Sequence, residues 1–183
     1  MKQDLLASLR AAIVALLAFT VLTGVIYPLV VMGIGKAAFA HRANGAPELV
    51  GQAFTDPKYF WSRPSAASYN AMTSTGTNYG PANPALHEAV AARVKALREA
   101  DPGNQTPVPI DLVTASASGL DPHISPAAAE FQAGRVARLR GLPVDRVRAL
   151  IAEATAGRTL GFLGEPRVDV TALNRALDAG PPR

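Results

Sequence analysis

The strongest constraint on the fold is a run of 25 residues, 11–35, that contains no charged side chain. A membrane-spanning helix needs roughly 20 predominantly apolar residues to cross about 30 Å of hydrocarbon. At about 1.5 Å per residue, the run extends for roughly 37 Å as a helix. Pro28 removes one backbone donor within it, which predicts a bend near residues 24–28. The run therefore predicts a retained membrane anchor over residues 1–40, with the spanning helix at about 11–35.

A cleaved signal peptide is the alternative for this run. Residues 38–40, Ala-Phe-Ala, match the small-x-small cleavage pattern. The apolar cores of signal peptides, however, have about 7–15 residues, and Lys36 separates the longer run from this pattern. We therefore favour the anchor.

The charges beside the run give a small preference for its orientation. Lys2 and Arg10 precede it and Lys36 and Arg42 follow it, so the positive-inside count is nearly balanced. The free N-terminal amine favours a cytoplasmic N-terminus. This orientation predicts a single-pass protein with an exported domain at residues 41–183.

Composition excludes other classes of protein. The sequence pI of about 9.8 arises largely from residues that flank the apolar run, because residues 41–183 hold 15 basic and 13 acidic side chains. Nucleic-acid-binding domains concentrate Lys and Arg on one face, so no nucleic-acid partner is expected. The chain has no cysteine, which excludes disulfides, thiolate metal sites and cysteine nucleophiles.

The exported part is predicted to be rich in helix. Three helices are expected from helical spacing of apolar residues, beginning after Asn83, Ser125 and Pro143 and ending near Asp101, Gly141 and Gly157. A last helix passes through Leu173 and Leu177. Short strands are expected at 48–54, 58–61 and 167–170, and a long polar loop at 62–83. The predicted fold class is α+β: one N-terminal transmembrane helix followed by a helix-rich soluble domain with a few short strands.

One dense polar cluster offers the residue types of a hydrolase, namely Thr114, Ser116, Ser118, Asp121 and His123. A catalytic triad is assembled by the fold from separated segments, whereas Asp121 and His123 share one turn, which favours a backbone-capping role. The alternative function is a membrane-tethered exported hydrolase that uses Ser116 or Ser118. No metal site is expected, because the three histidines have no ligand spacing.

Five arginines gather in 14 residues: Arg135, Arg138, Arg140, Arg146 and Arg148. Arginine presents a planar fork of donors that suits phosphate or anionic headgroups. The competing interpretation, which we favour, is a solvated outer face on two neighbouring helices.

With these residues in hand, the chain resembles the C subunit of the Kdp-type potassium-transporting P-type ATPase of bacteria. The densest match is residues 111–126, which read DLVTASASGLDPHISP. Further matches lie along nearly the whole chain, at residues 24–28, 49–52, 59–66, 83–84, 135–137, 167–168, 173–174 and 177–178.

The resemblance implies an accessory subunit, not itself an enzyme, of an ATP-driven high-affinity potassium import complex in the bacterial cytoplasmic (inner) membrane, with its soluble domain in the periplasm. Its implied partners are a channel-like subunit and a P-type ATPase subunit that hydrolyses ATP. The family is also described as a catalytic chaperone that raises the ATP affinity of the ATPase subunit. This implies ATP as a shared ligand and Gln132 as the nucleotide contact. ATP is cytoplasmic, so an exported domain could not contact it. The two properties implied by the resemblance therefore conflict.

Overall fold

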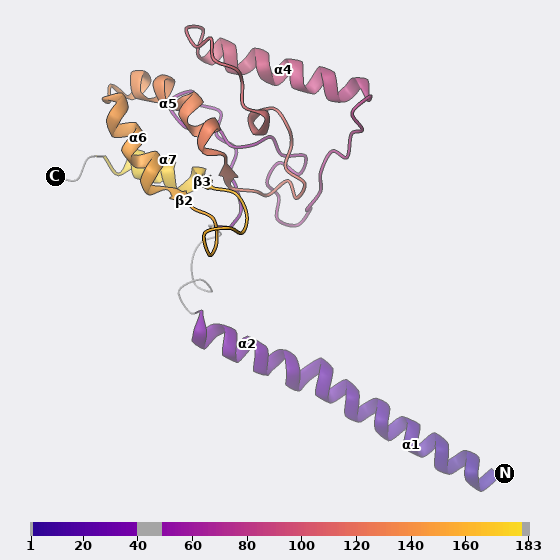
Figure 1. The fold of residues 1–183 in the computed structure, drawn as a ribbon. Helices are drawn as coiled ribbons and strands as arrows, with labels where there is room; N and C mark the ends of the chain where they lie inside the picture. The colour runs from indigo at the N-terminus through magenta and orange to yellow at the C-terminus, as the bar shows by residue number, and fades with distance from the viewer. Residues whose placement is uncertain (1, 40–48, 181–183) are drawn as a thin grey trace. The chain divides into compact units, whose positions relative to one another are not determined.

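The computed structural model describes residues 2–39 and 49–180. The chain divides into two compact units, residues 1–46 and 47–183, which are described separately. Figure 1 shows a long helix in the first unit and a mixed helical domain in the second.

The first unit is helical from Lys2 to Ala38, as α1 (Lys2–Val21), a π-helical stretch (Leu22–Ile26) and α2 (Tyr27–Ala38). Within it, Leu5–Ala38 is long and apolar enough to cross a membrane, with a mean hydropathy of 2.4. The long apolar helix predicted from the sequence is therefore confirmed, and it continues beyond both ends of the predicted span.

The π-helical stretch lies where the sequence predicts a bend. The backbone N–H of Tyr27 donates to the carbonyl of Leu22, five residues earlier. A proline ring clashes with the carbonyl four residues before it in a regular α-helix, and the wider turn before Pro28 relieves that contact. Thr23 Oγ1 donates to the carbonyl of Phe19 at 2.7 Å. The irregularity thus falls at the predicted place as a π-helical turn.

The second unit contains four α-helices in its described residues: α4 (Pro84–Ala100), α5 (Pro126–Arg140), α6 (Val144–Glu153) and α7 (Val170–Asp178). A short 3-10 helix lies at Ile110–Leu112. Two begin with the predicted caps, since Asn83 accepts from the N–H of Ala85 at 2.9 Å and Ser125 accepts from that of Ala128 at 3.0 Å. Gly141 ends α5 with a φ of 64°, a left-handed conformation that favours glycine. These local predictions are confirmed.

A small antiparallel sheet joins three short strands in the order β1-β3-β2. They are β1 (His123–Ile124), β2 (Thr155–Ala156) and β3 (Arg167–Asp169). Val168 in the central strand lies opposite Ile124 on one side and Thr155 on the other. Only β3 is predicted from the sequence, and α6 ends earlier than expected because Thr155 and Ala156 pair with β3.

The strands expected at 48–54 and 58–61 are wrong. Glu48 lies outside the described residues, and residues 51–61 form no strand. The polar stretch 62–83 contains no helix or strand, as predicted.

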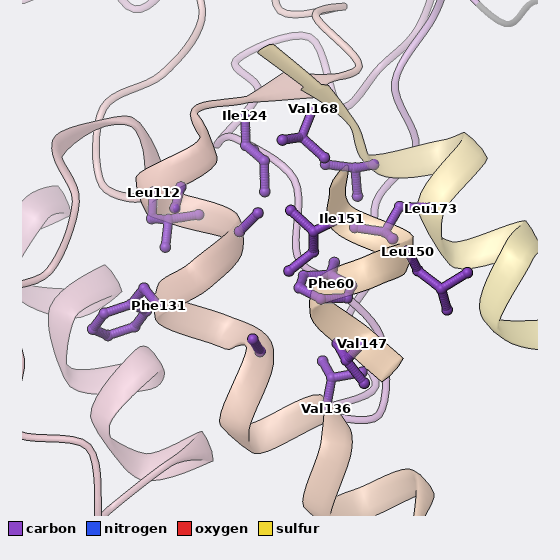
Figure 2. Close-up of a cluster of buried hydrophobic side chains, with 14 of the residues drawn as sticks. Phe60, Leu112, Ile124, Phe131, Val136, Val147, Leu150, Ile151, Val168 and Leu173 are labelled. Carbon is purple, nitrogen blue, oxygen red and sulfur yellow. The ribbon is translucent and has the colours of Figure 1, made fainter. Parts of the chain in front are cut away.

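Helix α5 forms the centre of the core and buries eight of its residues. Figure 2 shows Val136 of this helix with Val147 of α6, and Phe60 among the core side chains. Phe60 is fully buried although the segment around it has no regular structure, so something other than a ladder of backbone hydrogen bonds must hold it.

Candidate functional site

The first polar centre of the soluble unit holds residues 57–61 against α5 and α7. The side-chain amide of Asn174, on α7, accepts from the N–H of Phe60 at 2.9 Å and donates to its carbonyl at 3.0 Å. This is the exchange that a neighbouring strand would make with a hydrogen-bonded residue. Asn174 is 2% exposed, so the pair of bonds is shielded from water.

Gln132, on α5, binds both backbone groups of Trp61 in the same way. Its Oε1 accepts from the N–H of Trp61 at 2.8 Å, and its Nε2 donates to the carbonyl of Trp61 at 3.2 Å. Nε2 also donates to the carbonyl of Ala128 at 3.2 Å, and Oε1 also accepts from Arg135 Nη2 at 2.7 Å. An amide has two donor hydrogens and two acceptor positions, so these four bonds use them all.

These bonds define what a nucleotide contact at Gln132 would require. The side chain is 1% exposed, and a direct bond to ATP would replace one of four bonds made within the chain. The contact stays a prediction. Asn174 belongs to the family match at 173–174, but no site role was predicted for it. Both amides stand at helical spacing from apolar residues, Gln132 from Ala128 and Asn174 from Val170.

Arg135 completes this centre from the same face of α5. It is 2% exposed, its Nη1 donates to the carbonyls of Pro57 and Tyr59, and its guanidinium lies 4.8 Å from the centre of the Trp61 ring. Burial lowers the pKa of Arg135 to about 10, which keeps the side chain charged at neutral pH. The prediction of a solvated outer face is therefore wrong for Arg135.

Arg140 extends the contacts with the same segment toward α7. Its Nε donates to the carbonyl of Lys58 at 2.8 Å, and its Nη2 lies 2.9 Å from Asp178 Oδ1. The guanidinium also lies 4.7 Å from the centre of the Tyr59 ring. Two arginines thus bind the carbonyls of residues 57–59.

Two further arginines fit the solvated interpretation. Arg138 pairs with Asp101 at 2.9 Å and its side chain is 57% exposed. Arg148 pairs with Glu130 at 2.6 Å, and both side chains are half-exposed. Since each has a carboxylate partner, these two arginines do not form an open anion site.

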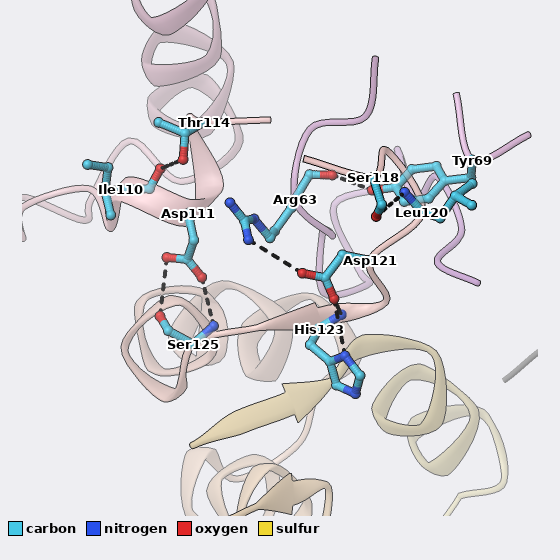
Figure 3. A network of polar contacts seen from close by, with 10 residues as sticks. All are labelled: Arg63, Tyr69, Ile110, Asp111, Thr114, Ser118, Leu120, Asp121, His123 and Ser125. Carbon is cyan, nitrogen blue, oxygen red and sulfur yellow. Dashed lines mark hydrogen bonds and ion pairs between the residues drawn. The ribbon is translucent and has the colours of Figure 1, made fainter. Parts of the chain in front are cut away.

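The second polar centre is built from residues 110–125 and appears in Figure 3. Asp111 accepts from the N–H of Ser125 at 2.7 Å and lies 3.2 Å from its hydroxyl, which steadies the cap of α5. Asp121 accepts from the N–H of His123 at 3.0 Å, and the same carboxylate oxygen is 3.1 Å from His123 Nδ1. Its other oxygen is 3.4 Å from Arg63 Nη1.

The polar loop packs directly on this centre. The N–H of Ser116 donates to the carbonyl of Pro64 at 3.1 Å, and that of Thr75 donates to the carbonyl of Ser118 at 3.0 Å. Gly119 has a φ of +67°, and a Cβ there would lie 2.6 Å from the carbonyl oxygen of Thr75. Only glycine allows the loop to approach so closely.

Tyr69 makes a further contact within the polar loop. Its hydroxyl donates to the carbonyl of Arg63, and burial raises the pKa of Tyr69. The phenol therefore stays neutral and keeps its proton for this bond.

The serines and the histidine of this centre make separate contacts. Ser118 Oγ accepts from the N–H of Leu120 at 3.1 Å, and the His123 ring faces Asp121. The bond from the His123 N–H to Asp121 is the kind that the capping interpretation predicts, and among the hydrogen bonds of residues 49–180 none joins a serine hydroxyl to His123. The part of the chain that the structure describes also holds no group of three or more His, Cys, Asp or Glu able to bind a metal ion.

A hollow on the surface of the domain lies elsewhere. It has a volume of about 650 Å³ and is lined by residues that include Asp101, Phe131, Arg138 and Arg148. Gln132 is not part of its lining. The buried amide and this surface hollow are therefore separate features.

Comparison with known proteins covers almost the entire chain. The family model of the K+-transporting ATPase c chain, KdpC, matches residues 9–179. A potassium-transporting ATPase KdpC subunit from Methylococcus capsulatus is 56% identical over 183 residues, covering 93% of this chain and 96% of the relative. Subunits of the same name from Ralstonia nicotianae and Sorangium cellulosum are 55% and 57% identical, over 92% and 95% of this chain and 89% and 98% of each relative.

These matches include both units and both polar centres. Identity above 50% across such coverage agrees with the motif at residues 111–126 and with the apolar N-terminal helix. The chain therefore belongs to the KdpC family, the c chain of K+-transporting ATPases.

Proposed function

We propose that this protein is an accessory subunit of an ATP-driven potassium import complex and catalyses no hydrolysis itself. Family membership over residues 9–179 is the observation that carries the proposal. The contacts of Ser116 and Ser118 with the backbone of neighbouring loops agree with a non-catalytic role. The chemistry is then performed by partner subunits.

The proposed partners are a P-type ATPase subunit and a channel-like subunit of the same complex, with the lipid bilayer as the third contact. The helix Leu5–Ala38 supplies a single span. In this proposal the N-terminus is cytoplasmic and residues 49–180 lie on the periplasmic side of the inner membrane. The orientation is tested by fusing after Arg183 a reporter enzyme that works only outside the cytoplasm. The proposal predicts that this fusion is active.

Co-purification tests the assembly. A tagged full-length chain is recovered in mild detergent from potassium-starved cells, and the expected result is a P-type ATPase subunit in stoichiometric amount. The matched control carries the same soluble domain behind an unrelated single-span helix, which separates contacts made by residues 5–38 from those of the domain. Recovery of the native chain without a P-type ATPase would contradict the proposal.

We further propose that the subunit raises the affinity of the ATPase subunit for ATP. Two roles for Gln132 agree with that effect, a direct contact with ATP and the holding of Trp61. The four internal bonds of the amide favour the second role. An effect of Gln132→Ala on ATP dependence is therefore expected to arise from release of the 57–61 segment.

A further inference from the structure

The loop between β2 and β3, residues 157–166, carries a closed turn at its end. Thr159 and Leu163 exchange two backbone hydrogen bonds, of 2.8 and 2.9 Å. Leu160 lies inside this turn with a φ of +56°, a conformation that costs a non-glycine residue free energy. Gly161 and Gly164 also have positive φ, of 84° and 76°. The turn is thus a defined structure.

This turn exposes three large apolar side chains, which we call the apolar tip. Leu160 is 79% exposed, Phe162 is 68% exposed and Leu163 is 49% exposed. Within residues 49–180, these three side chains are not covered by other parts of the domain. Neighbouring exposed apolar side chains of this kind mark surfaces that contact a protein or a membrane.

Charged residues of both signs lie at the base of the loop. Arg158 pairs with Glu165 at 2.6 Å, and the exposed Arg167 begins β3. The hollow at the base is lined by two arginines and three carboxylates, so positive charge is not in excess there. An exposed apolar tip is suited to the boundary between lipid headgroups and acyl chains.

The base of the loop lies beside the start of the soluble unit. Glu165, Pro166 and Arg167 line one hollow with Arg63 and Asp121. Leu49 lines an adjoining hollow that also includes Arg63 and Asp121. The loop therefore leaves the domain close to the point where the chain arrives from the apolar helix.

The chain length keeps this region within reach of a bilayer. Leu49 follows Ala38 by 11 residues, so full extension separates them by at most about 38 Å. The helix that ends at Ala38 is the candidate membrane span. With the proposed membrane location, Leu49 stays within about 38 Å of the end of the span.

We propose that the apolar tip inserts into the membrane surface. The inference rests on the proposed single-span membrane location. Lipid is favoured over a protein partner because three side chains at a loop end offer far less than the roughly 800 Å² per partner of a stable protein interface. The tip thereby limits the orientations of the domain at the membrane.

The absence of cysteine from the chain allows a labelling test. Three full-length variants, Leu163→Cys, Leu17→Cys and Met72→Cys, receive an environment-sensitive fluorophore and are reconstituted in vesicles of neutral and anionic phospholipid containing a spin-labelled quencher lipid. Met72 is 92% exposed in the polar loop and serves as the aqueous control. The expected result is a blue shift and loss of emission for the labels at positions 17 and 163 and none at position 72.

The other outcomes separate the two proposals. A label at position 17 without lipid quenching would overturn the membrane location itself. Quenching at 17 without quenching at 163 would overturn the tip insertion alone. A label at 163 shielded from water only when partner subunits are added would also overturn it, in favour of a protein contact. Adding Leu160→Ser and Phe162→Ser to Leu163→Cys is expected to abolish the quenching at 163, and unchanged quenching would count against the tip.

Discussion

Residues 57–61 and 110–125 are both held by polar side chains, but the side chains come from different distances along the sequence. Phe60 and Trp61 are bound by amides 114 and 71 residues away. Asp121 binds His123, two residues on, and Asp111 binds Ser125, 14 residues on. The first set is almost fully buried, whereas Asp111 and Asp121 are partly exposed.

The difference teaches how each centre contributes to stability. A buried amide that loses its partner pays the full cost of desolvation, whereas a partly exposed group recovers hydrogen bonds from water. We therefore expect the 57–61 contacts to be worth more than those of 110–125. Trp61 is the single tryptophan, so its fluorescence reports on the first segment directly.

Asn174→Ala is expected to have the largest effect. It leaves the N–H and the carbonyl of Phe60 buried without partners, which lowers the free energy of unfolding by about 2–4 kcal/mol. Denaturant titration of the full chain in detergent, followed by Trp61 fluorescence, measures the loss. Asn70→Ala, in an exposed turn, is the control and should stay within about 0.5 kcal/mol. Equal losses in the two variants would break the distinction between buried and exposed amides.

Arg135→Met is expected to follow. It keeps the apolar stem but removes the donors to Pro57, Tyr59 and Gln132, at a cost of about 1–3 kcal/mol. The same titration measures it. Arg148→Met is the control, where an ion pair between two half-exposed side chains is worth less than about 1 kcal/mol. A larger loss at Arg148 than at Arg135 would contradict the assignment of Arg135 to the core.

Asp111→Ala probes the more local centre. Its carboxylate supports the residue that caps α5, so the expected loss is about 0.5–1.5 kcal/mol. A double-mutant cycle with Ser125→Ala should show coupling between the two positions. Strictly additive losses would mean that the two side chains do not act together.

Asp56 is expected to give the smallest effect, one that depends on pH. A hydrogen bond from the backbone N–H of Lys58 lowers the pKa of Asp56 below its ordinary value of 3.8. The charged form therefore stabilises the fold above that value, and the contribution is lost as the pH falls through the lower folded-state value. Above about pH 5, Asp56→Asn should slightly lower the midpoint of unfolding. In strong acid the variant and the native chain should have the same midpoint. A difference between the two midpoints that grows as the pH falls would contradict the lowered pKa of Asp56.

The same contrast explains how much of the structure could be predicted from the sequence. The caps at Asn83 and Ser125 depend on partners two or three residues away, so a short window contains all the required residues. The long apolar helix is equally predictable because its length and apolarity alone define it. The family resemblance rests on a continuous motif, residues 111–126, and is confirmed.

Predictions that depended on distant partners fared worse. Residues 58–61 look like a strand, yet the groups that bind Phe60 and Trp61 are side chains of α7 and α5. Arg135 was assigned to a solvated face because a run of charged residues usually forms one. Its partners are backbone carbonyls, which no residue pattern in the sequence reveals. β1 and β2 have two residues each, too few for a pattern of alternation.

Comparing Gln132→Ala with Asn174→Ala in the assembled complex tests the central claim most directly, since the two amides hold adjacent residues of one segment. The measurement is the ATP concentration for half-maximal potassium-stimulated hydrolysis. If Gln132 acts by holding Trp61, both variants should shift it in the same direction and by similar factors. A shift with Gln132→Ala and none with Asn174→Ala would contradict the account and favour a direct contact between Gln132 and ATP.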